Sequence, residues 1–294
     1  MADNRKRVVV AGATGHQGGA VTKHLLKNGF KVVAITRNPD SQAAQNLKKN
    51  NGIEVYKGDL FRPDTIEQCF EDVYGVFSVQ NFWEHGYQGE IEQGRVMIDL
   101  AKRARVKHFV YNSVGSAHRN TGLAHFDSKF EIEKYLKQSG LNYTIFRPVF
   151  FMDNFLSMHN QILEGKLVNA MDNNVPLQMV AVDDIGAFVA QAFTNPDIFN
   201  KKEIDIAGDS KTFPEIAAIF SENLGHEVKY VKLDLDEYRN IMGDEYAKMV
   251  DWFNNVGYEA DIDALRQNYD VELTSFKDWV KMADFKQFKV QQHK

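Results

Sequence analysis

A glycine-rich loop between an expected strand and an expected helix limits the fold of this chain more than any other feature. Gly12, Gly15 and Gly18 stand three residues apart, after the β-branched run Val8-Val9-Val10 and at the start of a helical pattern over Gly18–Asn28. The first glycine suits a tight exit from the strand, the second lets backbone approach a diphosphate, and the third lets the helix pack close to the sheet. The helix start adds unpaired N–H groups and the positive end of a dipole. The loop therefore predicts a dinucleotide site, with a purely structural turn as the alternative.

Short apolar runs alternate with helical patterns over the first half of the chain. This alternation is typical of βαβ units, whose right-handed crossovers build a parallel sheet. We therefore predict an α/β fold, a Rossmann-type doubly wound parallel sheet. The expected strands are Arg7–Ala11, Lys31–Thr36, Glu54–Lys57, Val73–Val79, His108–Ser113 and Asn142–Arg147, and the expected helices are Gly18–Asn28, Ser41–Asn50, Pro63–Phe70, Gln88–Arg103 and Phe126–Ser139.

The alternation loosens after Pro148. No internal repeat and no Pro/Gly linker follows, so we predict a Rossmann domain over residues 1–150 and a smaller C-terminal α+β lobe over residues 151–294, packed on the sheet. The prediction leaves open that some segments after residue 150 pack in the first domain. The lobe is expected to hold helices at Phe150–Leu163, Asp184–Thr194, Pro214–Leu224 and, with polar character, Val228–Trp252, and a strand at Glu203–Ala207.

Composition and charge narrow the possible partners. The chain has 294 residues, with 35 Lys+Arg against 40 Asp+Glu and a formal net charge of -5, which argues against direct binding of nucleic acid by bulk electrostatics. The single cysteine, Cys69, excludes a disulfide framework and a thiolate metal cluster, and its helical surroundings predict a small apolar filler. No His-x-x-x-His pair is present, so no metal site is expected. The absence of a signal-peptide core and of an apolar run of about 18 residues predicts a soluble, intracellular protein without a membrane partner.

The residue after the second expected strand predicts which dinucleotide binds. An NAD-preferring site usually places an Asp or Glu there, to bond the ribose 2′-hydroxyl. In this chain Lys31–Thr36 runs directly into Arg37, whose planar guanidinium suits a phosphate. We therefore predict NADP(H) rather than NAD(H) as the cofactor. An exposed arginine with no role in binding is the alternative.

Several motifs together resemble the NmrA-like family of atypical short-chain dehydrogenase/reductases. The likeness extends over nearly the whole chain and is strongest to the NADPH-sensor branch of that family. The motifs are the loop Gly12–Gly19, Thr36-Arg37-Asn38-Pro39, Gly58-Asp59-Leu60, His125-Phe126-Asp127-Ser128-Lys129, Phe151-Met152-Asp153-Asn154 and Val182-Asp183-Asp184-Ile185-Gly186.

The resemblance also shows what is missing. Typical short-chain dehydrogenases carry a catalytic Tyr four residues before a Lys that lowers its pKa. None of the 11 tyrosines has Lys at that spacing; at the place of the motif, His125 replaces the Tyr while Lys129 remains. We therefore assign no catalytic residue and do not expect a conventional dehydrogenase. Replacement of the phenol by His125 stays open, because imidazole titrates near neutral pH. Ser113, at the place of the usual catalytic serine, is interpreted as a plain hydroxyl at the end of a strand.

The resemblance implies a longer set of cofactor-binding residues than the glycine loop, Arg37 and Lys129. Lys129 should reach the nicotinamide ribose. The diphosphate should be surrounded by Gly12, Thr14, Gly15, His16 and Gln17, the adenine approached by Asp59 and Leu60, the nucleotide flanked by Gln80, Asn81 and Phe82, and the nicotinamide end lined by Phe151, Met152, Asp153 and Asn154.

Two kinds of function fit these features. The resemblance implies a regulatory NADP(H)-binding redox sensor that acts through a protein partner, in transcriptional regulation, in the cytoplasm and also the nucleus. A homodimer is open as well, since the apolar faces of the expected helices Gln88–Arg103 and Phe126–Ser139 either pair subunits or bury against the sheet. The alternative is an NADPH-dependent reductase of the quinone- or isoflavone-reductase type. Lys129 would then stabilise a developing oxyanion. A set of aromatic side chains, the apolar ring, would receive a flat substrate, unless these side chains belong to the hydrophobic core. A repressor that binds a transcription factor also fits the resemblance. The ring consists of Phe82, Trp83, Phe150, Phe151 and Phe155.

Overall fold

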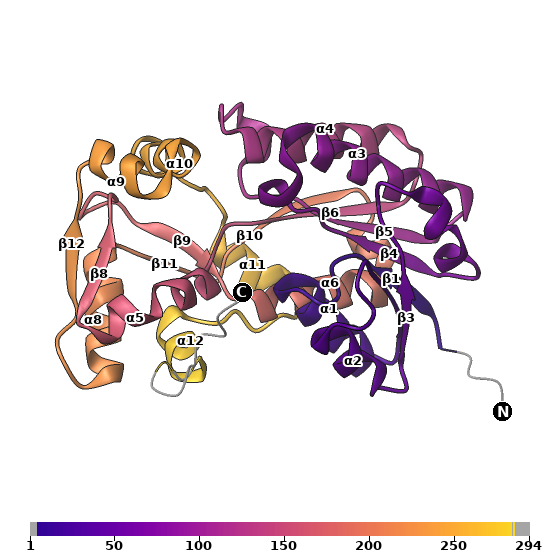
Figure 1. Cartoon of the computed structure of the whole chain (residues 1–294), viewed down its shortest axis with the longest axis horizontal. Coiled ribbons are helices and arrows are strands. Elements are labelled where there is room, and N and C mark those ends of the chain that lie inside the picture. Colours follow the sequence, from indigo (N-terminus) through magenta and orange to yellow (C-terminus); the bar gives the residue numbers. More distant parts are fainter. Residues whose placement is uncertain (1–4, 284, 286–294) are drawn as a thin grey trace. The chain divides into compact units, whose positions relative to one another are not determined.

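The structure, a computed structural model, describes residues 5–283 and 285. It divides into two compact units. The first contains residues 5–147 together with Ile185–Ile204, and the second contains Pro148–Asp184 together with the described residues from Asp205 onward. Each unit has its own strands and helices (Figure 1). Each also has its own buried side chains.

A seven-stranded sheet forms the centre of the first unit, in the order β10-β6-β5-β4-β1-β2-β3. Strand β1 pairs in parallel with β2 on one side and β4 on the other, and the β2–β3, β4–β5 and β5–β6 pairs are also parallel. The strand order reverses between β1 and β4, which is where ligands bind in doubly wound sheets. The predicted Rossmann-type sheet is confirmed. Its strands are β1 Arg7–Val10, β2 Lys31–Thr36, β3 Ile53–Lys57, β4 Gly75–Ser78, β5 His108–Asn112, β6 Tyr143–Pro148 and β10 Lys202–Ile206.

Helices connect the strands of this sheet. A parallel sheet needs such crossovers, and its strands are buried on both faces, which explains the apolar runs in the sequence. The α-helices are α1 His16–Lys27, α2 Gln42–Lys48, α3 Phe82–Arg103, α4 Ala124–Gln138, α6 Val182–Thr194 and α7 Pro196–Phe199, and η3 Ala117–Arg119 is a 3₁₀ turn.

The prediction of a helix over Pro63–Phe70 is wrong. Two 3₁₀ turns, η1 Pro63–Thr65 and η2 Glu67–Phe70, take its place, because Ile66 between them has a φ of -121°, outside the helical range. Cys69 lies fully buried in the second turn, where burial raises the pKa of its thiol to about 11. A buried neutral thiol is the apolar filler that was predicted.

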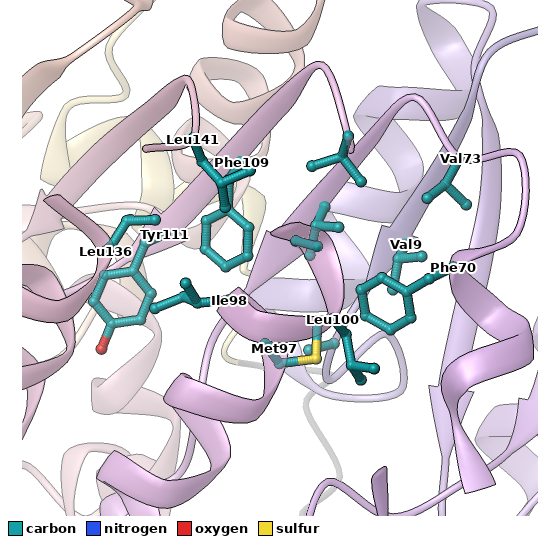
Figure 2. Packing of buried hydrophobic residues seen from close by; sticks show 14 of the residues in the cluster. Val9, Phe70, Val73, Met97, Ile98, Leu100, Phe109, Tyr111, Leu136 and Leu141 are labelled. Carbon is teal, nitrogen blue, oxygen red and sulfur yellow. The ribbon is translucent and has the colours of Figure 1, made fainter. Parts of the chain in front are cut away.

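Helices α3 and α4 bury apolar side chains against one face of the sheet. Figure 2 shows Phe109 and Tyr111 of β5 facing Met97 and Ile98 of α3, with Leu136 of α4 beside them. All five are fully buried or nearly so. At about 25 cal/mol per Å² of buried apolar surface, such contacts are the main favourable contribution to folding.

Short strands and helices make up the second unit. Strands β7, β9 and β11 form one sheet, with β9 parallel to β7 and antiparallel to β11, and β8 pairs in parallel with β12. The strands are β7 Phe150–Phe151, β8 Lys166–Asn169, β9 Leu177–Val180, β11 Asp209–Lys211 and β12 Lys229–Lys232, and the helices are η4 Met152–Met158, α5 His159–Leu163, α8 Phe213–Leu224, α9 Leu235–Met242, α10 Asp244–Asn255, α11 Ile262–Asn268 and α12 Phe276–Met282.

Two predictions for this unit need correction. The expected helix Phe150–Leu163 begins instead as strand β7 and a 3₁₀ stretch, and the expected helical region Val228–Trp252 begins with strand β12. The ring of Phe155 lies 5.3 Å from that of Phe276 and 5.8 Å from that of Phe220, all within the core of this unit. Phe155 is therefore a core residue and does not line a substrate site.

A buried histidine on β5 should make the first unit sensitive to acid. His108 is fully buried, its Nε2 lies 2.8 Å from the Thr144 hydroxyl, and burial lowers the pKa of the imidazole from 6.5 to about 4, against a weaker opposing effect of Asp197. Below pH 6.5 protons therefore bind the unfolded chain before the folded one. The free energy of unfolding should fall by about 2 kcal/mol between pH 7 and pH 5 on this account.

Urea unfolding at the two pH values tests this prediction. His108→Gln, which keeps a hydrogen-bonding group toward Thr144, should lose about 2 kcal/mol less than the wild type over that interval. The exposed His118, replaced by Gln, serves as the matched control and should keep the wild-type dependence. Equal acid sensitivity of wild type and His108→Gln would contradict the assignment.

Candidate cofactor site

The loop after β1 has the backbone that its glycines predicted. Gly12 takes a φ of +67°, a conformation that side chains other than glycine rarely adopt, and its carbonyl accepts a hydrogen bond from the Gly15 N–H at 2.9 Å. A Cβ on Gly18 would lie 2.2 Å from the Gly12 carbonyl oxygen. Gly18 is therefore needed because α1 approaches the loop backbone that follows β1. The contact is not, as the sequence predicted, with the strands of the sheet.

The start of α1 faces this loop without a capping side chain. The helix begins at His16, two residues earlier than predicted, and its N-cap is Gly15, which carries no side chain to accept from the first-turn N–H groups. The first turn also contains no acidic residue. Thr14, Gly15 and His16 are exposed, so the positive end of the helix is open to an anion. The side chain of Gln17 is held by a hydrogen bond from the Asn112 amide at the end of β5.

Arg37 stands at the carboxyl end of β2, beside the glycine loop of β1. Its side chain is 56% exposed, and its Nη2 lies 2.5 Å from Oε1 of Glu84, near the start of α3. The guanidinium is thus at the edge where a nucleotide ribose would lie. Glu84 was not singled out in the sequence, because nothing local links a residue after β4 to one after β2.

Asp59 and Leu60 form the turn after β3. The Asp59 carboxylate accepts from the Phe61 N–H at 3.0 Å, and the Asp59 N–H donates to the Thr65 hydroxyl at the same distance. Leu60 packs partly buried against the cluster of apolar side chains under α3. Hydrogen bonds within this turn therefore fix the conformation of the two residues predicted to approach adenine.

The residues after β4 combine a buried amide with an exposed turn. Gln80 is buried and donates to the Ser78 hydroxyl at 2.8 Å, while its Oε1 has no hydrogen-bond partner among the residues that the structure describes. The Asn81 side chain accepts from the Trp83 N–H at 3.1 Å and begins α3. The ring of Phe82 lies 5.4 Å from that of Trp83.

Lys129 extends from α4 to the carboxyl edge of the sheet, where it pairs with a buried carboxylate. Its ammonium forms an ion pair with Glu90 of α3, and it lies 3.4 Å from the Gln80 carbonyl oxygen. Glu90 is fully buried, and its second oxygen accepts from the Ser128 hydroxyl. Glu90 is not among the residues predicted from the sequence, although its place on the face of α3 that buries Met97 indicates burial.

The residues at the places of the dehydrogenase Ser and Tyr are held in other contacts. Ser113 donates to Glu133 at 2.6 Å, and Glu133 in turn binds Arg147 through two hydrogen bonds of 2.9 and 2.6 Å. His125 is buried, with its ring 5.2 Å from that of Trp83 and 4.7 Å from that of Phe126.

Tyr111, two residues before Ser113, is not suited to replace the missing phenol. Tyr111 on β5 is fully buried, and burial, together with the nearby charges of Glu90 and Glu133, raises the pKa of its phenol well above 10. A dehydrogenase acid needs a pKa shifted toward neutral pH, which is the opposite direction.

The four residues predicted for the nicotinamide end belong to the second unit. Phe151 ends β7, and Met152, Asp153 and Asn154 open the 3₁₀ stretch η4. The Asp153 carboxylate accepts from the Val182 N–H at 3.0 Å, so it caps the first turn of α6. The role of the four residues toward a cofactor stays a prediction. The other predicted residues lie in the first unit, after strands β1 to β4 and, for Lys129, on α4.

Two other classes of site have no counterpart in the part of the chain that the structure describes. Within residues 5–283 and 285, His, Cys, Asp and Glu side chains form no group of three or more that is able to hold a metal ion. None of the described helices combines the length and apolar character that crossing a membrane requires.

Comparisons with known proteins agree with this architecture. The model of the NmrA-like family matches residues 4–286. An NmrA-like family domain-containing protein of Dictyostelium discoideum is 30% identical, over 96% of this chain and 99% of its own. An NADPH-dependent quinone oxidoreductase from Escherichia coli, solved in complex with NADPH, has a TM-score of 0.80 at 25% identity and covers 94% of this chain and 99% of its own. NmrA, a negative transcriptional regulator solved with NADP, has the same TM-score at 20% identity over 94% of each chain, a likeness of fold.

Proposed function

Because this chain belongs to the NmrA-like family, we propose that it is an NADP(H)-binding regulatory protein, a redox sensor that lacks the machinery of a conventional dehydrogenase. The observation that carries the proposal is a contrast within one unit. The glycine loop keeps Gly12, Gly15 and Gly18, which suit a phosphorylated dinucleotide, whereas the phenol of the Tyr-x-x-x-Lys pair is replaced by the buried His125.

The residues of the first unit fit the cofactor. The positive φ of Gly12 favours glycine, the close approach of Gly18 leaves no room for a Cβ, and the open start of α1 suits a diphosphate. Arg37 suits a 2′-phosphate. The orphaned Oε1 of Gln80 offers an acceptor at the same edge. The quinone oxidoreductase and NmrA, which share this fold, were solved with NADPH and NADP.

A regulatory role requires that cofactor binding favours one conformation over another. Two segments at the carboxyl edge are suited to such a change, 81–88 and 114–124. Gly86 interrupts the first with a φ of 66°, and Ser116 and Asn120 in the second take left-handed φ values of 62° and 52°. Backbone strain of this kind is typical of switch regions. A protein partner, a homodimer and a nuclear as well as cytoplasmic location are parts of the same proposal.

A reductase is the second candidate, favoured by the 25% identity to the NADPH-dependent quinone oxidoreductase. An ammonium has three N–H donors, and Lys129 directs them to Glu90 and the Gln80 carbonyl, with capacity for a ligand oxygen. In this candidate the hydride comes from the reduced nicotinamide when bound. Lys129 would stabilise the negative charge that develops on the substrate oxygen.

Titration and a turnover assay distinguish the two candidates. Calorimetry with NADP⁺ and NADPH should show binding, and NADPH mixed with a panel of quinones and aldehydes should not be oxidised above the rate without protein. Suppose that NADPH is oxidised, that Lys129→Ala abolishes this oxidation, and that the exposed control Lys134→Ala on the same helix leaves it intact. The reductase would then replace the sensor as the proposed function. Failure to bind either nucleotide at millimolar concentration would overturn both.

A further inference from the structure

We propose that Glu84 is a second specificity-determining residue, which competes with the 2′-phosphate of NADP(H) for Arg37 and so weakens the preference for NADP(H) over NAD(H). This inference rests on the proposed cofactor site. It concerns a residue that the sequence motifs do not mark, and it follows from the contact between Arg37 and the turn after β4.

The contact joins the ends of two strands that flank β1. In the sheet order β4-β1-β2, Arg37 follows β2 and Glu84 follows β4. Their side chains meet at 2.5 Å between Nη2 and Oε1. A carboxylate from one side of the glycine loop therefore lies against the guanidinium on the other side.

The backbone around Glu84 fixes it in this place. Asn81 accepts from the Trp83 N–H and starts a single helical turn, and Gly86, with φ 66° and ψ -173°, separates that turn from the rest of α3. A Cβ on Gly86 would meet no atom within 4 Å, so the glycine serves the positive φ rather than packing. The second oxygen of Glu84 lies 3.7 Å from Nε2 of His85.

The charge of the Glu84 carboxylate affects the relative affinity for the two dinucleotides. A 2′-phosphate on Arg37 brings a doubly negative group to within a few ångströms of the Glu84 carboxylate, so that Glu84 must move away or repel it. A 2′-hydroxyl carries no charge and can donate a hydrogen bond to a carboxylate. Glu84 thus supplies, from the neighbouring strand, the kind of group that NAD sites usually place after the second strand.

The size of the effect is limited by solvent. The side chains of Arg37 and Glu84 are 56% and 41% exposed, and ion pairs at such positions are weak. Glu84→Gln, which removes the charge and keeps an amide of similar shape, should tighten NADP⁺ binding by about two- to fivefold. NAD⁺ binding should stay the same or weaken, so the ratio of the two affinities should rise.

The experiment is calorimetric titration of four proteins with NADP⁺ and with NAD⁺. They are the wild type, Glu84→Gln, Arg37→Ala and Glu92→Gln. Glu92 is an exposed glutamate on the same helix, so its variant matches the change in net charge without touching the pair. We expect the affinity ratio to rise in Glu84→Gln, to fall in Arg37→Ala and to stay at the wild-type value in Glu92→Gln.

Each other result identifies what has failed. A fall in the ratio in Arg37→Ala with no change in Glu84→Gln would overturn the role of Glu84 and leave the cofactor site standing. An equal rise in Glu84→Gln and Glu92→Gln would show an effect of net charge and also overturn it. A ratio unchanged in Arg37→Ala would remove the assignment of Arg37 and the inference with it, and no binding of NADP⁺ by any variant would remove the proposed function itself.

Discussion

Glu133→Ala is expected to lower the free energy of unfolding by about 3–5 kcal/mol, because it breaks a buried ion pair. The Glu133 carboxylate is fully buried and receives hydrogen bonds from Arg147 at 2.9 and 2.6 Å and from Ser113 at 2.6 Å. Without it, the guanidinium of Arg147, whose side chain is only 5% exposed, loses its main counter-ion. Glu203, 2.5 Å from Arg147, remains and should keep the loss toward the lower end of the range.

A neighbouring ion pair on the same helix provides the matched control. Glu131 pairs with Lys134 at the surface of α4, where both side chains are more than one-third exposed. Glu131→Ala should therefore cost less than about 1 kcal/mol. Urea unfolding of both variants beside the wild type measures the difference. Equal losses for Glu131→Ala and Glu133→Ala would mean that burial of the pair does not govern its contribution.

The parallel sheet was predictable because burial on both faces leaves a strong pattern. Strand β2 contains Val32, Val33 and Ile35, and its bounds, Lys31–Thr36, are those expected from the sequence. The glycine loop was predictable for a related reason, since a positive φ favours glycine at Gly12 and a close approach requires it at Gly18. Local constraints of this kind are visible in any single sequence.

The strands of the second unit carry no such pattern. Strand β12, Lys229–Lys232, has four residues with lysine at each end, and β7 has only two residues. Pairing with β8 and β9 holds them, so their conformation depends on contacts distant in the chain. The return of Ile185–Ile204 to the first unit is also a long-range effect. A Cβ on Gly186 would lie 2.7 Å from the backbone of Ala20, so this glycine permits the close packing of α6 on α1.

The same distinction separates the predicted from the missed residues of the site. Arg37 was found because it follows a recognisable strand, and Lys129 because it keeps its place in a motif. Their counter-ions, Glu84 and Glu90, lie on another element and are joined to them only by folding. Polar residues at the start of a helix are common, so a single sequence offers no reason to select Glu84. The apolar face that Glu90 shares with Met97 indicates that Glu90 is buried, but it does not indicate which residue pairs with it.

Gly18→Ala is expected to weaken NADP⁺ binding by at least about tenfold. The added Cβ would lie 2.2 Å from the Gly12 carbonyl oxygen, 2.4 Å from its carbon and 2.7 Å from the Ala13 nitrogen, and all three are backbone atoms. The loop or the start of α1 must shift, and the N–H groups that we propose to bind the diphosphate lose their alignment. A hydrogen bond to a charged group is worth about 1.5–3 kcal/mol, so the loss of one such bond costs about ten- to a hundredfold in affinity.

Gly19→Ala is the control that separates this clash from a general effect of alanine in the helix. The nearest atom to a Cβ on Gly19 is the Ala13 carbonyl oxygen at 3.7 Å, an ordinary contact. Alanine favours a helix over glycine by about 1 kcal/mol, so this variant should be as stable as the wild type or more so, with unchanged affinity for NADP⁺. If both variants bound NADP⁺ with wild-type affinity, NADP⁺ binding would not depend on the close approach of α1 to the end of β1. A loss of affinity in Gly18→Ala alone would tie binding to the backbone contact between Gly18 and Gly12.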